Sequence, residues 1–360
     1  MRVTAVRGHD FRCYERVAVE LPAGLVGVVG PNGAGKTSLI EMIHFGLVAY
    51  SPRTTNERRL VRLGQPLLRV EADVVVGGAE ISTRVGYQPG EPKHILVAGA
   101  PIESAERLLA RFPVLVFTPD RLRLVQGAPA LRRSYFDRVL ARLWPAASGA
   151  AAEYGRALVQ RNHLLRRVRA HAASVDALDP WDEQAAHWGA ELIAARVRLV
   201  DALRPALIAR AGELGGDPGD APLRYIARVE GDHDHLLAAL RERRGRDIER
   251  AVTGVGPHLD DYAIEDGGRD LRSFGSQGEQ RRALLGLILA EADVITEQRG
   301  ERPLLLLDDV TGEFDAGRRE LLLAALTRFD QAVVTTTDPA DLGGAAASLI
   351  AVDAGTVAAA

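Results

Sequence analysis

The chain has 360 residues, of which 47% are hydrophobic, so it is long enough for about two domains and a sizeable core. Its single cysteine, Cys13, excludes an internal disulfide framework, and the net charge of −3 gives no overall attraction to a polyanion. The first residues lack the basic-then-apolar pattern of a signal peptide, and no apolar run approaches the roughly 18 residues of a membrane span. We therefore expect a folded cytoplasmic protein that does not enter a membrane.

Residues 1–120 predict short strands around one helix. Alternating or continuous apolar stretches with many valines and isoleucines, punctuated by glycine, are typical of strands. The predicted elements of this part are strands at 17–21, 25–29, 67–87, 94–98 and 114–117 and a helix at 37–50.

The character of the sequence changes at about residue 121, where alanine, leucine and arginine begin to recur at helical spacing. This pattern breaks at Trp144-Pro145, Asp179-Pro180 and 215–219. The later predicted elements are a helix at 278–292 and strands at 304–307 and 332–336. We predict an α/β protein with two parts, a head formed by residues 1–120 and 246–360 and an inserted helical domain formed by residues 121–245.

A glycine-rich loop separates the first predicted helix from the strand before it. Residues 30–37 read G-P-N-G-A-G-K-T, which fits the P-loop pattern G-x-x-x-x-G-K-[ST]. In such a loop main-chain N–H groups close on phosphate oxygens, the lysine reaches the β- and γ-phosphates, and the hydroxyl group holds Mg²⁺. Lysine occurs only at positions 36 and 93, which favours a specific use for Lys36. The predicted nucleotide-binding residues are Gly30, Pro31, Asn32, Gly33, Ala34, Gly35, Lys36, Thr37 and Ser38.

Two acidic residues follow the apolar run 304–307. A buried strand that ends in Asp308 and Asp309 has the form of a Walker B element, which brings carboxylates to the edge of the sheet where nucleotide binds. We expect Asp308 to hold Mg²⁺ together with Thr37, and Asp309 to orient or deprotonate the attacking water. Lys36 and Asp309 are the predicted catalytic residues. An ordinary surface turn after a strand is the alternative for the two acids.

A serine- and glycine-rich string opens the helix predicted at 278–292. Residues 273–280 read S-F-G-S-Q-G-E-Q and resemble the signature of ABC-type ATPases, usually written L-S-G-G-Q. A serine hydroxyl group and N-terminal helix N–H groups form an anion site. In that family the signature of one subunit caps the γ-phosphate held by the other. The residues that resemble it are Ser276, Gln277, Gly278 and Glu279. A helix N-cap with an acidic first turn is the simpler alternative.

Two more positions resemble ABC elements. Asp315, within residues 312–315, falls where the D-loop belongs, and Asp120 falls at the Q-loop, which couples phosphate to the helical domain. Where ABC proteins commonly place a switch histidine, residues 335–338 read T-T-T-D. The resemblance therefore implies weaker sensing of the γ-phosphate.

Further stretches resemble the RecF family, within the ABC-type ATPases of the SMC kind. They are residues 119–137, 256–261, 276–281 and 308–309, and the likeness extends from residue 1 to about residue 340. Phe136, Gly312 and Phe314 depart from the residues usual in RecF proteins. The resemblance implies an ABC-type P-loop ATPase head, with a mixed central sheet and an antiparallel β subdomain, plus an inserted helical lid. It also implies ATP-dependent homodimers that serve DNA recombination, repair, replication and the SOS response. Such dimers engage gapped or junction DNA and, with RecR and RecO, help RecA to load.

Arginines crowd the first half of the helical domain, with few acids among them. A phosphate-binding face has this composition, because contacts to a nucleic-acid backbone need charge but no base reading. A solvated helix surface has the same composition, so the pattern leaves both interpretations open. The candidates for DNA contact are Arg121, Arg123, Arg132, Arg133, Arg161 and Arg166.

These residues together predict an ATP-gated DNA clamp. ATP and Mg²⁺ bind at the P-loop and Asp308, two heads close through Ser276 and Gly278, and hydrolysis assisted by Asp309 reopens them. DNA-stimulated hydrolysis is expected to be slow, because aspartate is one methylene shorter than the glutamate usual in ABC proteins and the switch histidine is missing. An ABC transporter ATPase, an SMC-like structural ATPase and a nucleotide-binding regulator that never contacts DNA are the alternatives.

Overall fold

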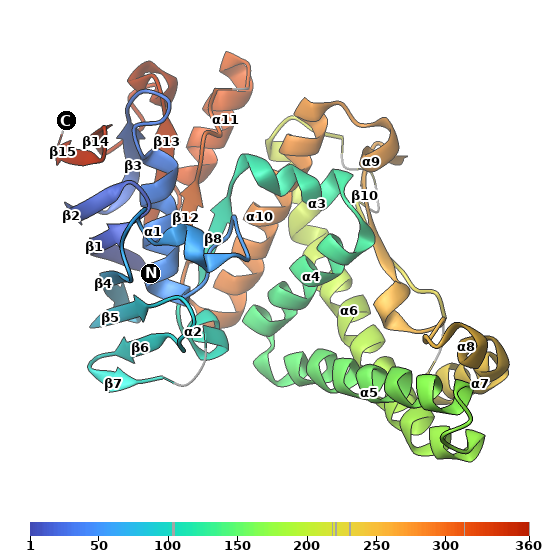
Figure 1. Ribbon diagram of the computed structural model, residues 1–360. Coiled ribbons are helices and arrows are strands. Elements are labelled where there is room, and N and C mark those ends of the chain that lie inside the picture. Colours follow the sequence, from blue (N-terminus) through green and yellow to red (C-terminus); the bar gives the residue numbers. More distant parts are fainter. Residues whose placement is uncertain (103–104, 218, 220–221, 230–231, 313, 360) are drawn as a thin grey trace. The chain divides into compact units, whose positions relative to one another are not determined.

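The computed structural model describes residues 1–360 except 103–104, 218, 220–221, 230–231, 313 and 360. The chain divides into two compact units. Unit 1 comprises residues 1–122, 209–216 and 277–360, and unit 2 comprises residues 123–208 and 217–276. Unit 1 joins the two ends of the chain, drawn in blue and red in Figure 1. Among the described residues, no helix combines the length and the apolar character that crossing a bilayer requires.

Unit 1 contains a six-stranded mixed sheet with the strand order β15-β14-β3-β13-β12-β8. Its strands are β3 (Gly24–Val29), β8 (Val114–Phe117), β12 (Leu304–Leu307), β13 (Gln331–Thr336), β14 (Ser348–Asp353) and β15 (Thr356–Ala359). All neighbouring pairs are parallel except β14 with β15. β8 and β12 are buried along their whole length, which explains why they are continuous apolar runs in the sequence.

A second six-stranded sheet of unit 1 is antiparallel, with the order β2-β1-β4-β5-β6-β7. Its strands are β1 (Arg2–Phe11), β2 (Tyr14–Glu20), β4 (Leu68–Val76), β5 (Ala79–Tyr87), β6 (His94–Val97) and β7 (Ala100–Pro101). The helices of unit 1 are α1 (Lys36–Val48), α2 (Ala105–Arg111), α10 (Gln277–Arg299) and α11 (Ala316–Leu326).

Helix α1 lies between the two sheets of unit 1 (Figure 1), because it contacts β1, β4 and β5 on the one hand and β8, β12 and β13 on the other. Nearly all of its residues are buried, so the helix is apolar around most of its circumference and belongs to the core. The mixed sheet, the antiparallel sheet and the helix between them confirm the predicted architecture of the head.

Unit 2 is mainly helical. Its helices are α3 (Arg123–Gln126), α4 (Pro129–Leu143), α5 (Pro145–Arg169), α6 (Asp179–Glu213, whose last turn belongs to unit 1), α7 (His233–Glu242), α8 (Arg244–Arg250) and α9 (Leu271–Phe274). A small antiparallel sheet has the order β11-β10-β9, formed by β9 (Leu223–Ile226), β10 (Asp261–Asp266) and β11 (Arg269–Asp270).

The compact units differ from the boundary expected at residue 246. β10 pairs with β9, with Asp261 opposite Ile226, so residues 246–276 belong to the helical unit rather than to the head. The last turn of α6 belongs instead to unit 1, where Arg210 makes two hydrogen bonds, of 2.6 and 2.7 Å, to the carboxylate of Asp293 on α10. Pairing between residues far apart in the sequence sets both boundaries.

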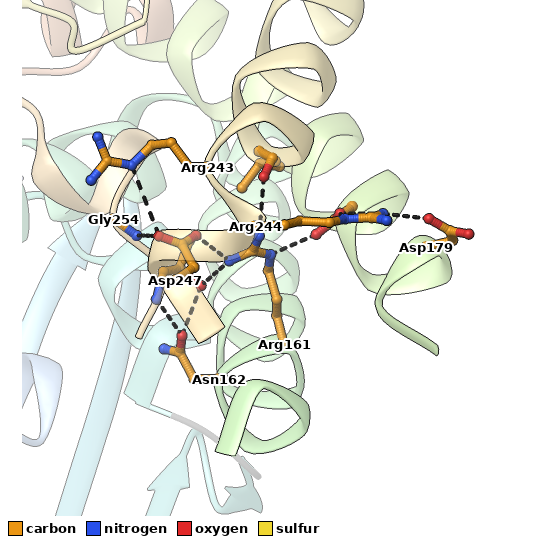
Figure 2. Close-up of polar contacts among 10 residues, drawn as sticks. Arg161, Asn162, Asp179, Arg243, Arg244, Asp247 and Gly254 are labelled. Atoms are coloured by element: carbon orange, nitrogen blue, oxygen red, sulfur yellow. Dashed lines mark hydrogen bonds and ion pairs between the residues drawn. The ribbon is translucent and has the colours of Figure 1, made fainter. Parts of the chain in front are cut away.

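A buried ion network joins α5, α6 and α8 (Figure 2). The side chain of Arg161 is 0% exposed; its guanidinium donates to Asp182 at 2.6 Å and to Asp247 and Thr253 at 2.8 Å. Arg244 also donates to Asp182, at 2.6 Å. The structure corrects the prediction that Arg161 contacts DNA, because its charge is enclosed and its donors already have partners.

Replacing Arg161 by leucine should lower the free energy of unfolding by about 3–5 kcal/mol, because two buried carboxylates, Asp182 and Asp247, each lose the one cation that is fully buried with them. Denaturant unfolding followed by circular dichroism measures the loss. Arg156→Leu is the matched control, since Arg156 lies on the same helix, is 68% exposed and, within the described residues, forms an ion pair with Glu153 alone. A surface pair of that kind contributes about 0–1 kcal/mol. Equal losses in the two variants would show that the buried network adds no more stability than a surface pair.

Candidate nucleotide site

The strand order of the mixed sheet brings the P-loop and the two acids to one edge. β3 ends at Val29, directly before the P-loop, and β12 ends at Leu307, directly before Asp308. β13 lies between these two strands and is parallel to both. Because parallel strands end at the same edge of a sheet, all three deliver the residues that follow them to one place.

Two glycines give the P-loop its shape. Gly33 and Gly35 have φ angles of +82° and +119°, a region that glycine enters without the steric cost that other residues incur. A Cβ atom at position 35 would also lie 2.8 Å from the hydroxyl oxygen of Tyr14. The loop therefore depends on glycine at position 35 for both its backbone conformation and its close packing.

Lys36 begins α1 with its side chain over the loop. Its ammonium group donates to the carbonyl oxygens of Gly30, at 2.7 Å, and Pro31, at 3.0 Å. Burial lowers the pKa of Lys36, while the carboxylates of Asp309 and Asp308 act in the opposite direction. The lysine thus lies where its charge can act on a phosphate above the loop and on the two acids beside it.

Asp308 is buried and held by two hydroxyl groups. Its Oδ1 atom accepts hydrogen bonds from Thr37, at 2.9 Å, and from Thr335, at 2.8 Å. Burial raises the pKa of Asp308, and the hydrogen bonds from Thr335 and Thr37 oppose that rise. The bond from Thr37 ties the first turn of α1 to the end of β12.

Asp309 has a different environment from its neighbour. It is exposed and has a φ angle of +50°, in the left-handed region, and its N–H group donates to Oγ1 of Thr335 at 2.9 Å. One acid of the pair is therefore enclosed and fixed, whereas the other faces solvent. This arrangement suits one carboxylate to a metal ion and the other to a water molecule.

The oxygen atoms at this edge fit Mg²⁺. The Thr37 hydroxyl group and the Asp308 carboxylate are hard ligands that lie 2.9 Å apart. No group of three or more His, Cys, Asp or Glu side chains able to hold a metal occurs in the described part of the chain. A Mg²⁺ ion here therefore needs phosphate oxygens and water to complete its octahedral shell, as is usual in nucleotide sites.

A buried carboxylate on α1 orders a loop beside the site. Glu41 is 0% exposed and accepts hydrogen bonds from Arg12, at 2.8 and 2.9 Å, and from Ser51, at 2.5 Å. Arg53 lies 3.7 Å from Glu41, and its charge opposes the effect of burial on the pKa of Asp308. Arg53 was not among the predicted site residues; the signal for it in the sequence was Glu41, the one acid in a mostly apolar helix.

The residues that resemble an ABC signature lie where α10 begins. Ser276 is the last residue of unit 2, and Gln277 is the first residue of α10. Ser276, Gln277 and Gly278 are exposed, and Glu279 is half-buried. The predicted helix start is confirmed, and its first turn presents a serine and a glycine to solvent.

Asp315 and Asp120 lie at other ends of elements in unit 1. Asp315 precedes α11 and accepts a hydrogen bond from the N–H group of Arg318 at 2.9 Å, and Asp120 is exposed in the turn after β8. Within the described residues, no hydrogen bond or ion pair joins either aspartate to Lys36. Glu313 of the expected D-loop lies outside the described residues.

Two of the predicted DNA contacts, Arg132 and Arg133, make hydrogen bonds within unit 2. Arg132 is 2% exposed and donates to both carboxylate oxygens of Asp261, at 2.7 and 2.9 Å, and to the carbonyl oxygen of Gly127. The prediction that Arg132 contacts DNA is therefore corrected, because its guanidinium is enclosed. Arg133 is half-buried and donates to the carbonyl oxygen of Asp260 at 2.6 Å, and its contact with DNA stays a prediction.

Known proteins of similar sequence place the chain in a family. Residues 5–85 match the AAA domain family model. The chain is 38% identical over 360 residues to the DNA replication and repair protein RecF of Myxococcus xanthus, over 96% of this chain and 93% of that protein. The chain belongs to the RecF family. RecF of Acidothermus cellulolyticus is 36% identical over 346 residues, which cover 92% of this chain and 93% of that protein.

Solved structures agree with the RecF assignment. A structure of the recombination mediator protein RecF with ATP, from the RecFOR pathway, has a TM-score of 0.91 and 26% identity, over 99% of this chain and 97% of that one. An SMC head bound to the C-winged helix domain of ScpA has a TM-score of 0.60 and 15% identity, which shows a shared fold alone. The family and the ABC-type ATPase head predicted from the motifs are thereby confirmed.

Asp308→Asn should raise the free energy of unfolding of the nucleotide-free protein at about pH 7, by about 0.5–2 kcal/mol. The amide oxygen keeps both hydroxyl hydrogen bonds, and the cost of a buried charge disappears. Because the folded pKa of Asp308 is raised, its stabilising contribution is present at low pH and is lost as the pH rises through that pKa. The advantage of the asparagine variant should therefore shrink as the pH falls.

Denaturant titrations of Asp308→Asn and wild-type protein, at several pH values without nucleotide, test this expectation. Asp309→Asn is the matched control, because Asp309 is exposed and its charge carries little burial cost. A variant at position 308 that is less stable than wild type at neutral pH would contradict it.

Proposed function

We propose that the chain is an ATP-dependent DNA-binding protein of recombinational repair, in which ATP closes two copies into a clamp and slow hydrolysis opens it. The observation that carries the proposal is the hydrogen bond from Thr37 to Asp308, which joins a P-loop helix to a Walker B strand. Membership in the RecF family supports the role in repair.

The residues at the sheet edge have separate proposed roles in ATP binding and hydrolysis. The main chain of residues 30–38 cradles the phosphates, and Lys36 contacts the β- and γ-phosphates. Thr37 and Asp308 hold Mg²⁺, which when bound neutralises charge on the phosphates. Asp309, exposed beside them, orients the attacking water. The ATP-bound RecF structure of closely similar fold supports ATP as the nucleotide.

The proposed ATPase is slow and stimulated by DNA. The Asp309 side chain is one methylene shorter than glutamate, and no histidine follows β13, where residues 335–338 read T-T-T-D. Water positioning and γ-phosphate sensing are both weaker in such a site. A slow reaction suits a timer that limits how long the clamp stays closed.

Dimerisation completes the proposed site. Ser276, Gln277, Gly278 and Glu279 of one copy cap the γ-phosphate that the P-loop of the other copy holds. The exposure of Ser276 and Gly278 at the start of α10 supports this role, because helix N-terminal N–H groups there can reach an anion. Asp315 aligns the opposing site, and Asp120 couples phosphate to the helical unit.

The proposed partners are DNA, RecR, RecO and RecA, in the cytoplasm and away from membranes. The ATP-bound RecF of similar structure is a recombination mediator of the RecFOR pathway, which supports RecR and RecO as partners. The dimer engages gapped or junction DNA and, with those partners, helps RecA to load. DNA contact is what separates this function from that of a plain nucleotide-binding regulator.

Exposed arginines on unit 2 form the proposed DNA surface. Arg123 and Arg166 of unit 2 keep their predicted role, and so does Arg121, which is partly exposed and belongs to unit 1. Around Arg166 the exposed arginines are Arg167 and Arg169 on α5 and Arg246 and Arg250 on α8. Arg169 donates to the carbonyl oxygen of Glu249 at 3.5 Å, which joins the two helices. Among the described residues Arg166, Arg167 and Arg169 have no acidic partner, so their charges remain available to phosphates.

Two variants should distinguish ATP binding by one copy from ATP-dependent dimerisation of two copies. Lys36→Ala should abolish ATP binding and dimerisation together, because the charge on the β- and γ-phosphates loses its counterion. Ser276→Arg should keep ATP binding and prevent dimerisation, because a large cation blocks the capping surface. Light scattering with ATP, with ADP and without nucleotide measures the dimer. Ser82→Arg, at an exposed serine on β5, is the control and should dimerise normally. Normal dimerisation of Ser276→Arg would refute capping between two copies.

Removing the charges of Arg166, Arg167 and Arg169 by glutamine should weaken binding to gapped duplex DNA about tenfold. Binding should also become less sensitive to salt: the plot of log affinity against log salt concentration should become less steep by about one for each arginine that contacts a phosphate. The matched control replaces three ion-paired arginines of the same unit by glutamine: Arg156, Arg204 and Arg224. Fluorescence anisotropy at several salt concentrations provides both quantities. Equal losses in the two triple variants would show that net charge, rather than this surface, attracts DNA.

A further inference from the structure

Thr335 occupies the centre of the nucleotide edge. It lies near the end of β13, which is flanked by β3, leading into the P-loop, and by β12, leading into Asp308. The residue is 0% exposed. Neither the P-loop pattern nor the Walker B pattern includes it, so only the strand order brings it to the site.

The hydroxyl group of Thr335 makes two hydrogen bonds. Its O–H donates to Oδ1 of Asp308 at 2.8 Å, and its oxygen accepts from the N–H group of Asp309 at 2.9 Å. An ionised carboxylate can only accept and a main-chain N–H group can only donate, so both directions are fixed. One side chain therefore holds the carboxylate of the first acid and the main chain of the second.

Each of these bonds fixes a part of the site that hydrolysis needs. Oδ1 of Asp308 also accepts from Thr37, so hydroxyl groups from α1 and β13 hold the carboxylate in one orientation. Asp309 has a left-handed φ angle of +50°, which few non-glycine residues adopt, and the bond to Thr335 anchors the main chain at that turn. Without the hydroxyl group, Asp308 keeps one anchor of two, and the turn at Asp309 loses its amide partner.

We propose that Thr335 is a positioning residue for ATP hydrolysis, which orients Asp308 toward the Mg²⁺ site and Asp309 toward the attacking water. The proposal rests on the proposed function, since it requires nucleotide phosphate at the P-loop. It assigns to a strand residue, through the two acids, part of the alignment that ABC proteins obtain from a switch histidine.

Thr336 provides a matched control on the same strand. It is 1% exposed, and its hydroxyl group donates to Asp341 at 2.9 Å and accepts from the N–H group of Asp338 at 3.3 Å. The two threonines thus make the same kinds of hydrogen bond, but those of Thr336 involve neither Asp308 nor Asp309. Valine at either position removes a buried hydroxyl group and keeps the branched shape of the side chain.

The test uses wild type, Thr335→Val, Thr335→Ser and Thr336→Val. For each protein, it measures the rate of ATP turnover and the affinity for a fluorescent ATP analogue with and without Mg²⁺. Thr335→Val should lower kcat about 10- to 100-fold. It should also reduce the gain in affinity that Mg²⁺ brings by about tenfold. Thr335→Ser keeps the hydroxyl group and should restore both quantities to within about threefold of wild type. Thr336→Val should keep both within about twofold, even where its thermal midpoint falls as far as that of Thr335→Val.

The positioning role would be overturned if Thr335→Val kept the wild-type kcat and the wild-type gain in affinity with Mg²⁺, or if Thr335→Val and Thr336→Val lost equal amounts of both. Either result would leave the proposed function standing. A wild-type protein that binds no nucleotide with Mg²⁺ would overturn the proposed function and this inference together. If Thr335→Val does not fold, Thr335→Ala removes the same hydroxyl group with less bulk. The expected losses are then the same.

Discussion

The enclosed carboxylate of Asp308 is the constraint around which the head is arranged. A buried charge is unfavourable unless hydrogen bonds replace the water it loses. Thr37 and Thr335 supply those bonds from α1 and β13, so the P-loop helix, the Walker B strand and the strand between them meet at one oxygen atom. The order β3-β13-β12 makes this meeting geometrically available. With Asp309 alongside and Lys36 beside both acids, the edge offers carboxylates to a cation and an ammonium group to phosphate.

Local pattern was enough to predict the parts of the protein that depend on neighbours in sequence. The apolar run 304–307 is β12 with the same bounds, and the break at Trp144-Pro145 falls between α4 and α5. The break at Asp179-Pro180 marks the start of α6. The P-loop and the paired acids are short contiguous strings, so their chemistry is recognisable before the fold is known. The trans role of Ser276 depends on a second copy and stays a prediction.

Residues whose role depends on a distant partner could not be predicted in this way. Arg161 and Arg132 have the sequence context of surface cations, yet their carboxylate partners lie 21, 86 and 129 residues away. Thr335 meets Asp308 across 27 residues, and only the strand order brings them together. The boundary at residue 246 differs for the same reason, because β10 pairs with a strand inside the expected insert. Composition shows which side chains are charged or polar, whereas the fold determines which of these side chains are buried.

The pairing of β3 has a consequence for how the protein is made. Both of its neighbours, β13 and β14, are encoded about 300 residues later. At a synthesis rate of about 5–20 residues per second, roughly 15–60 s pass between the synthesis of β3 and that of its partner strands, and both edges of β3 stay unpaired during that time. The segments of unit 2 end at residue 276, before either neighbour exists. The nucleotide site is therefore among the last parts to form on the ribosome, although its phosphate loop is among the first to emerge.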